Sequence, residues 1–170
     1  DDAVTLVLSY AEIPYDVIFD DEVLNDLLPK YDWLHLHHED FTGQYGKFYN
    51  NYANMPWYIE QVKEAEDAAR RFGFHKVSQA KEFVSGGGFL FAMCSATDSY
   101  DIALSAEGVD ICERMYDGDP ADPQAQEKLN FENTFAFTNF RLIRDPMQYE
   151  FSDIDNNFPD RGLRQDNDYF

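Results

Sequence analysis

The sequence predicts a single α/β domain with a doubly wound, mainly parallel sheet flanked by helices. Short apolar runs alternate with helical patterns along the chain, which is the order typical of a parallel sheet covered by helices on both faces. The 170 residues have the length of one domain and can bury a core without disulfides or metal ions. Hydrophobic residues make up 44% and aromatic residues 16%, which is more packing material than a disordered chain carries.

The first predicted elements are a helix and two short strands. Residues 3–12 place apolar side chains at helical spacing behind two acidic residues, which favour a helix N-terminus. Pro14–Phe19 and Tyr31–His37 have the composition of short strands, and residues 20–30 between them form a helical turn and a loop. Because a doubly wound domain normally opens with a strand, we expect its first, central strand to lie outside this sequence.

Two helices and a third strand follow. Residues 54–73 combine capping residues with one apolar stripe and predict a long helix. Residues 76–84 predict a second helix, which at nine residues reaches only about 13 Å. Because this is short for a crossover to the strand Phe89–Cys94, we expect residues to be missing near 79–81. The chain is thus read as one domain, 1–170, that is incomplete at both ends.

The last third of the chain is less regular. Residues 99–111 predict a helix that runs into a short extended piece, and residues 116–126 read as a loop. Thr134–Ile143 alternates apolar and polar residues, which indicates an antiparallel edge strand. From Ser152 onward the sequence is polar without periodicity.

The net charge and the length of the apolar runs argue against two classes of function. The formal net charge of −20 would repel a phosphate backbone, so no nucleic-acid partner is expected. No apolar run approaches the roughly 18 to 20 residues that span a bilayer, so no transmembrane segment is expected in this chain. Cys94 and Cys112 have no metal-binding spacing and form either a pair or two free thiols. The motifs point to no cofactor.

Cys94 is the strongest candidate for a catalytic residue. It follows a predicted parallel strand and precedes a predicted helix, the position at which α/β hydrolytic enzymes present a nucleophile. The small residues Ala92 and Ala96 suit a sharp elbow, and a helix N-terminus lowers a thiol pKa. The alternative is a cysteine that only fills space beside a turn. The candidates for substrate binding around it are Gly86, Gly87, Gly88, Ser95 and Asp98, although Asp98 suits the start of a helix better than a chemical role.

A histidine-rich segment follows the neighbouring strand. In a parallel sheet the carboxyl ends of strands form the ligand-binding edge, so His37, His38 and Glu39 are expected near Cys94. A histidine there can act as the base for the thiol and Glu39 can orient it. A weaker alternative is a metal-dependent hydrolase that uses His35, His37 and Glu39. The structural alternative is one histidine packed in the sheet and the others hydrogen-bonded in a loop.

Longer segments resemble known families. "FVSGGGFLFAMCSATDS" is similar to the glycine-rich segment of ThuA-like proteins, which belong to the class I glutamine amidotransferase-like superfamily. "DDAVTLVLSYAEIPYDVIFDDEVL", "YDWLHLHHEDFTGQYGKFY" and "AEGVDICERMYDGDPADP" resemble a family of exported bacterial proteins labelled asparagine synthetase B-like. This second resemblance covers nearly the whole chain.

The resemblance implies a flavodoxin-like fold and an exported protein, periplasmic or otherwise outside the cytoplasm, with a cytoplasmic location as the alternative. It places Cys94 at the amidotransferase nucleophile position, where ThuA-like proteins have histidine. The amidotransferase histidine follows its cysteine, whereas all four histidines here precede Cys94. True asparagine synthetase activity is not expected, because Phe89 and Leu90 replace the Asp and Ser of its pyrophosphate loop.

Two functions therefore stay open. The first is a cysteine-dependent hydrolase that acts on a carbon–nitrogen or acyl bond of an unidentified small molecule. The second is a module without catalysis that binds a carbohydrate or a protein partner at the same edge. The tyrosines and tryptophan of "GQYGKFYNNYANMPWY" suit stacking against a sugar or a protein surface.

Overall fold

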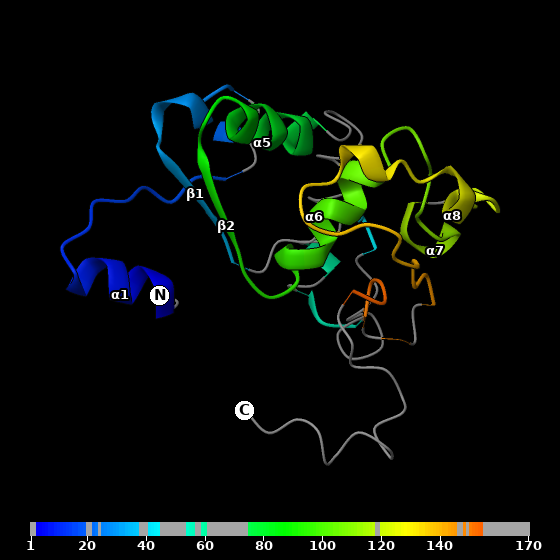
Figure 1. The fold of residues 1–170 in the computed structure, drawn as a ribbon. Coiled ribbons are helices and arrows are strands. Elements are labelled where there is room, and N and C mark those ends of the chain that lie inside the picture. The colour runs from blue at the N-terminus through cyan, green and yellow to red at the C-terminus, as the bar shows by residue number, and fades with distance from the viewer. Residues whose placement is uncertain are drawn as a thin grey trace, which may run out of the picture.

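The protein has a mixed α/β architecture in the computed structural model (Figure 1). The structure describes residues 3–19, 22–23, 25–37, 41–44, 54–56, 59–60, 75–117, 120–145, 148 and 150–154. The chain opens with helix α1 (Ala3–Tyr10), which confirms the predicted first helix. Most of the predicted helix 54–73 lies outside the described residues.

Two parallel strands form the sheet of the described region. Strand β1 (Trp33–Leu36) pairs with β2 (Phe89–Ala92), with Trp33 opposite Phe89 and Leu36 opposite Ala92. The prediction of parallel strands in these two segments is confirmed, with shorter bounds. The last ladder bond runs from the Met93 amide to the Leu36 carbonyl oxygen (2.9 Å), and β2 then ends in a turn.

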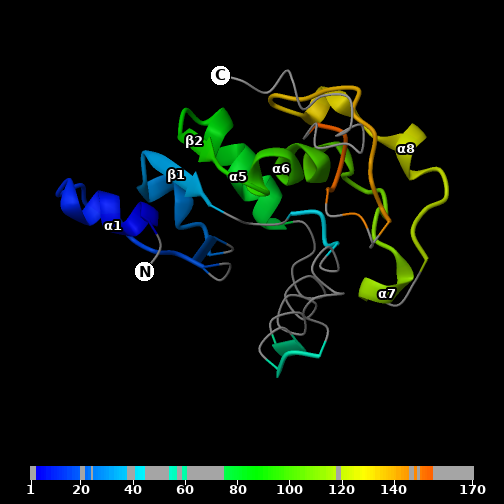
Figure 2. The same cartoon turned by 90° about the horizontal axis from the view of Figure 1, so that it is seen from below.

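One face of the sheet is packed. Leu34, Leu36, Leu90 and Ala92 alternate with their neighbours and point to the same face, as the two-residue period of a strand requires. Helices α5 (His75–Ser85) and α6 (Ala96–Ser105) cover this face (Figure 2), and α5 confirms the predicted helix at 76–84. Residues 79–81 lie within α5, which is continuous there. The core on this side includes Leu28, Phe83, Tyr100 and Leu104.

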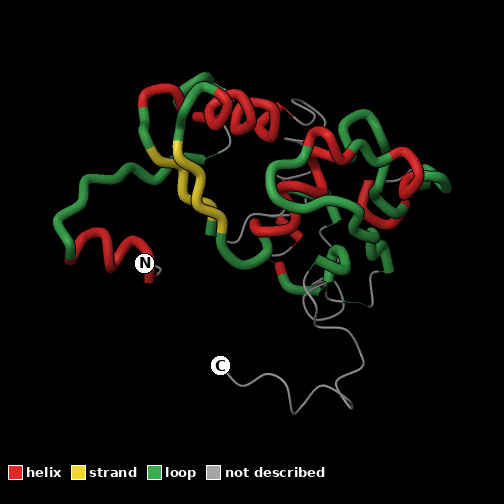
Figure 3. The backbone as a smooth tube through the Cα atoms, viewed as in Figure 1, coloured by secondary structure: helices red, strands yellow, loops and turns green. Residues whose placement is uncertain are grey.

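Helix α6 lies between two hydrophobic cores of the described region. Its residues are buried at every position except Thr97, because one side meets the sheet and the other meets a second core. That second core joins Ile102 of α6 to Ile111, Phe140 and Phe151. Two short helices contribute residues to it, α8 (Ala125–Lys128) and η3 (Phe131–Asn133). Of the other short helices, η1 (Leu28–Lys30) belongs to the first core through Leu28, and α7 (Arg114–Asp117) follows Ile111 along the chain; Figure 3 draws the helices in red.

The strand predicted at Pro14–Phe19 is wrong. This segment has no regular secondary structure, and Tyr15, Val17 and Phe19 are exposed. A strand needs a neighbouring strand to bond its amides and carbonyls. The sheet of the described residues contains only β1 and β2, so the segment has a strand composition without a sheet to join.

The edge strand predicted at Thr134–Ile143 is also wrong. Residues 131–133 form η3, and the amides of residues 135–137 donate to the carboxylate of Asp101 instead of to a neighbouring strand. What remains of the prediction is one isolated antiparallel bridge between Leu142 and Ser152. The alternating pattern is real, but a side chain from α6 takes the backbone donors.

The sheet differs from the predicted two-sided arrangement as well. Trp33, Phe89 and Phe91 remain 50%, 60% and 44% exposed on the face opposite α5 and α6. Within the part of the chain that the structure describes, that face is not buried by a helical layer. The described helices are also all too short or too polar to cross a membrane.

Candidate active site

Cys94 lies at the turn between β2 and α6, where the sequence predicts an elbow. Its φ is +51°, in the left-handed region, and its side chain is exposed. The turn is closed by bonds from the Ala96 amide to the Met93 carbonyl oxygen (3.1 Å) and from the Thr97 amide to the Cys94 carbonyl oxygen (3.0 Å). Ala96 is fully buried under the turn, so a small residue is required there.

The left-handed conformation makes Cys94 a strained position. This backbone conformation costs a residue with a Cβ atom about 1–2 kcal/mol of free energy, and glycine adopts it without that cost. We expect Cys94→Gly to be more stable to urea than Cys94→Ala by about 0.5–1 kcal/mol, because part of the gain is offset by the freer unfolded chain. The matched pair is Ser95→Gly and Ser95→Ala, where the helical φ of −61° should reverse the order. A Cys94→Gly protein less stable than Cys94→Ala would show that the turn is unstrained.

His37 is the candidate base that the structure places nearest to this turn by register. It follows β1 directly, and because Leu36 pairs with Ala92, His37 comes level with Met93, one residue before Cys94. Its ring lies 6.1 Å from the ring of His35. His35 is packed in the sheet against Phe91 at 5.2 Å between ring centroids, and its Nε2 atom is buried without a hydrogen-bond partner. His38 and Glu39 lie outside the described residues.

The glycines predicted to bind substrate are not brought together with Cys94. Gly86, Gly87 and Gly88 form the turn between α5 and β2, at the opposite end of the strand. Gly87 has a φ of +102°, and Gly88 lies so close to the ring of Phe83 that a Cβ atom would overlap it. The run of glycines therefore serves a tight turn and a close packing contact.

The two polar candidates on α6 differ in their surroundings. Ser95 is the N-cap residue and is half-buried beside Cys94. Asp98 is buried, and its carboxylate accepts a hydrogen bond from the Ser152 hydroxyl at 3.3 Å. Asp98 thus connects the first turn of α6 to the segment around Ser152. Because Asp98 is buried and Ser95 is half-buried beside Cys94, Ser95 is the better placed of the two for contact with a substrate.

Asp101 is a buried carboxylate whose role the sequence analysis did not predict. It is 2% exposed and accepts backbone hydrogen bonds of 2.8 Å from residues 135, 136 and 137. Burial of the Tyr100 ring, and to a smaller extent the charge of Asp101, raises the pKa of Tyr100. No local signal could reveal these bonds, since the donors lie more than thirty residues further along the chain.

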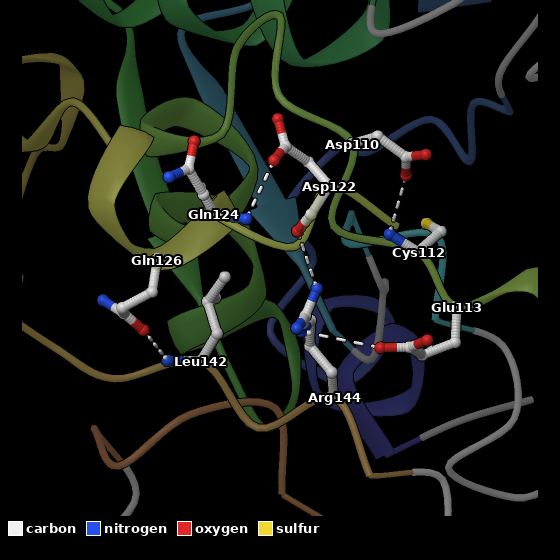
Figure 4. A network of polar contacts seen from close by, with 8 residues as sticks. All are labelled: Asp110, Cys112, Glu113, Asp122, Gln124, Gln126, Leu142 and Arg144. Carbon is white, nitrogen blue, oxygen red and sulfur yellow. Dashed lines mark hydrogen bonds and ion pairs between the residues drawn. The ribbon is translucent and has the colours of Figure 1, made fainter. Parts of the chain in front are cut away.

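A separate polar network joins residues between Asp110 and Arg144 (Figure 4). Arg144 donates to the Asp122 carbonyl oxygen at 3.0 Å and forms an ion pair with Glu113 at 3.6 Å. Asp122 also accepts from the Gln124 amide, and its bond with Lys128 holds the pKa of that carboxyl below its ordinary value. Glu113 and Asp122 are therefore engaged in bonds that stabilise the loops of this region.

No metal site is formed by the residues that the structure describes, in the sense of three or more His, Cys, Asp or Glu side chains gathered together. The set of His35, His37 and Glu39 is not tested by this finding, because Glu39 falls outside those residues.

Comparison of the chain with protein-family models, curated proteins and solved structures gave no match. The features of the molecule that indicate a function are the geometry of the elbow and the exposed sheet face.

Proposed function

We propose that the chain is a class I glutamine amidotransferase-like domain of an exported protein, with a flavodoxin-like fold, and that Cys94 is the nucleophile of a hydrolase acting on a carbon–nitrogen or acyl bond. The observation that carries this proposal is the elbow itself. An exposed thiol is held at a φ of +51° between a parallel strand and a helix of ten residues. Backbone strain of this kind concentrates at functional sites.

The arrangement at the elbow suggests a catalytic role for each of its residues. The Cys94 thiolate attacks the carbonyl carbon, the carbonyl oxygen takes the negative charge, and the amine leaves with a proton as the thioester forms. Water then attacks the thioester, and the thiolate leaves as the acid product forms. His37 is the described residue best placed by register to accept and return the proton. Ser95 lies beside the thiol at the first turn of α6.

A thiol substitution tests the proposal in the native protein. We expect Cys94→Ser to lower the hydrolysis of p-nitrophenyl acetate and of glutamine by about 10³-fold or more, because a nucleophile acts as a unit with its partners. Cys112→Ser is the matched control, since Cys112 donates to the Thr42 carbonyl oxygen and a hydroxyl can keep that bond. Activity that survives in Cys94→Ser, or native protein without activity, would contradict the hydrolase.

A second candidate function is supported by the exposed aromatic side chains of the sheet. Trp33 contacts Phe89 and Phe91 edge to face, with centroids 5.7 and 6.2 Å apart. Such a surface suits a binding module for a carbohydrate or a protein partner. This alternative predicts that Phe91→Ala weakens ligand binding while Cys94→Ser leaves it intact.

A further inference from the structure

The outward side chains of the sheet form one aromatic row that runs toward the turn after β2. Residues two apart on a strand share a face, and His35 pairs across the sheet with Phe91. The ring of His35 lies 5.2 Å from that of Phe91 and 6.1 Å from that of His37. Trp33 in turn contacts Phe91 edge to face. Met93, the last residue before the turn, is exposed at the end of this row.

This row is the apolar surface that adjoins the thiol. Cys94 directly follows Met93 and is exposed. The other face of the sheet is filled, because Leu36 and Ala92 pack there in the core that α5 and α6 complete. Among the described residues, the outward face is therefore where a group attached to the reacting carbonyl carbon can bury apolar area.

The chemistry of the row specifies an uncharged aromatic group. The outward positions carry no Lys, Arg, Asp or Glu, and they are Trp33, His35, His37, Phe89, Phe91 and Met93. The formal net charge of −20 makes the molecule unfavourable for a second negative charge on a ligand. Aromatic rings that meet edge to face or in an offset stack gain free energy beyond the area they bury.

The spacing along β2 gives the position of that aromatic group in the substrate. A strand advances about 3.3 Å per residue, so Phe91 lies about 10 Å from Cys94 along the chain. A ring that packs on Phe91 must therefore be joined to the reacting carbonyl group by a short chain.

We propose that the substrates of the Cys94 site are amides or esters whose acyl group ends in an uncharged aromatic ring, and that this ring packs on Phe91 and Trp33. This inference rests on the proposed hydrolase and adds its specificity. The acyl carbon bonds to the Cys94 sulfur as its bond to the amine or alcohol breaks, and the leaving group takes the thiol proton. Water then releases the aryl acid and restores the thiol. Phe91 is thus a specificity-determining residue for the acyl group.

Two esters with the same leaving group test the proposal on the native protein. We expect p-nitrophenyl γ-phenylbutyrate to have a KM about ten-fold or more below that of p-nitrophenyl acetate, because burial of the ring strengthens binding. Phe91→Ala should lower the preference for the aromatic ester, measured as the ratio of the two kcat/KM values, by about five-fold or more. Phe91→Leu keeps an apolar side chain without the ring and should lower the same ratio by about two-fold or more, which keeps the test open if Phe91→Ala fails to fold.

Phe135→Ala is the matched control. Phe135 is 45% exposed and Phe91 is 44% exposed, so each substitution removes a ring of similar exposure. Phe135 contacts Tyr100 of α6, which packs on the filled face of the sheet. This variant should keep the ratio of the native protein, and far-UV circular dichroism checks that every variant is folded.

The outcomes separate the specificity from the hydrolase itself. Cys94-dependent hydrolysis of both esters with equal KM values would overturn the aromatic site and leave the hydrolase standing. The same holds for a preference that survives in the folded Phe91 variants, or that Phe135→Ala lowers as much as they do. If neither ester is hydrolysed in a Cys94-dependent reaction, the proposed hydrolase is contradicted, and the specificity that rests on it is contradicted as well.

Discussion

Asp101→Asn is expected to cost about 3 kcal/mol of unfolding free energy, one of the two largest single-residue effects that the structure predicts. The carboxylate accepts three backbone amides at 2.8 Å, one on Oδ1 and two on Oδ2. Asparagine keeps only one of these oxygens and turns an NH₂ group toward the remaining donor or donors. At least one backbone amide would lose its acceptor, and the charge that strengthens the other bonds would be lost.

Urea unfolding followed by circular dichroism measures this effect. The matched control is Asp153→Asn, because Asp153 accepts one backbone amide, that of Arg141, at 2.7 Å but is exposed. We expect the control to lose less than about 1 kcal/mol, since water can replace the bond. Equal midpoints for Asp101→Asn and the parent protein would show that the segment at 135–137 is not held by this carboxylate.

Gly88→Ala is the second large effect, with an expected loss of about 2–3 kcal/mol. A Cβ atom at this position would overlap the ring of Phe83, which is buried in the core beneath the sheet. The ring cannot move outward without disturbing its neighbours, and added atoms in a packed core typically cost 1–3 kcal/mol.

A double substitution separates this steric cause from other costs. Phe83→Leu removes the ring atoms that meet the new methyl group, so Gly88→Ala should cost much less in the Phe83→Leu background than in the parent. The coupling between the two sites is read from four urea unfolding curves. Additive losses would mean that the cost of Gly88→Ala does not come from overlap with the Phe83 ring.

Most local elements of this protein could be predicted from short-range sequence patterns. Local sequence patterns predicted α1, α5 and both parallel strands, and the small residues around Cys94 predicted the turn between β2 and α6. The helix predicted within residues 99–111 corresponds to α6, which begins at Ala96 and ends at Ser105. These features depend on neighbours within one or two turns of the chain, and that is the range over which periodicity and capping act. The fold class at the level of mixed α/β was predictable for the same reason.

How those elements pair and pack depends on tertiary contacts. Pro14–Phe19 has the composition of a strand but no partner strand among the described residues, and the segment at 135–137 gives its amides to Asp101 instead of to a sheet. The glycines at 86–88 proved to serve a turn and the packing of Phe83. The missing partner of Pro14–Phe19 and the acceptor of the 135–137 amides depend on groups far apart along the chain, so a local pattern carries no information about them. Phe83 and Gly88 are close in sequence, but the position of the Phe83 ring is set by the core in which it is buried.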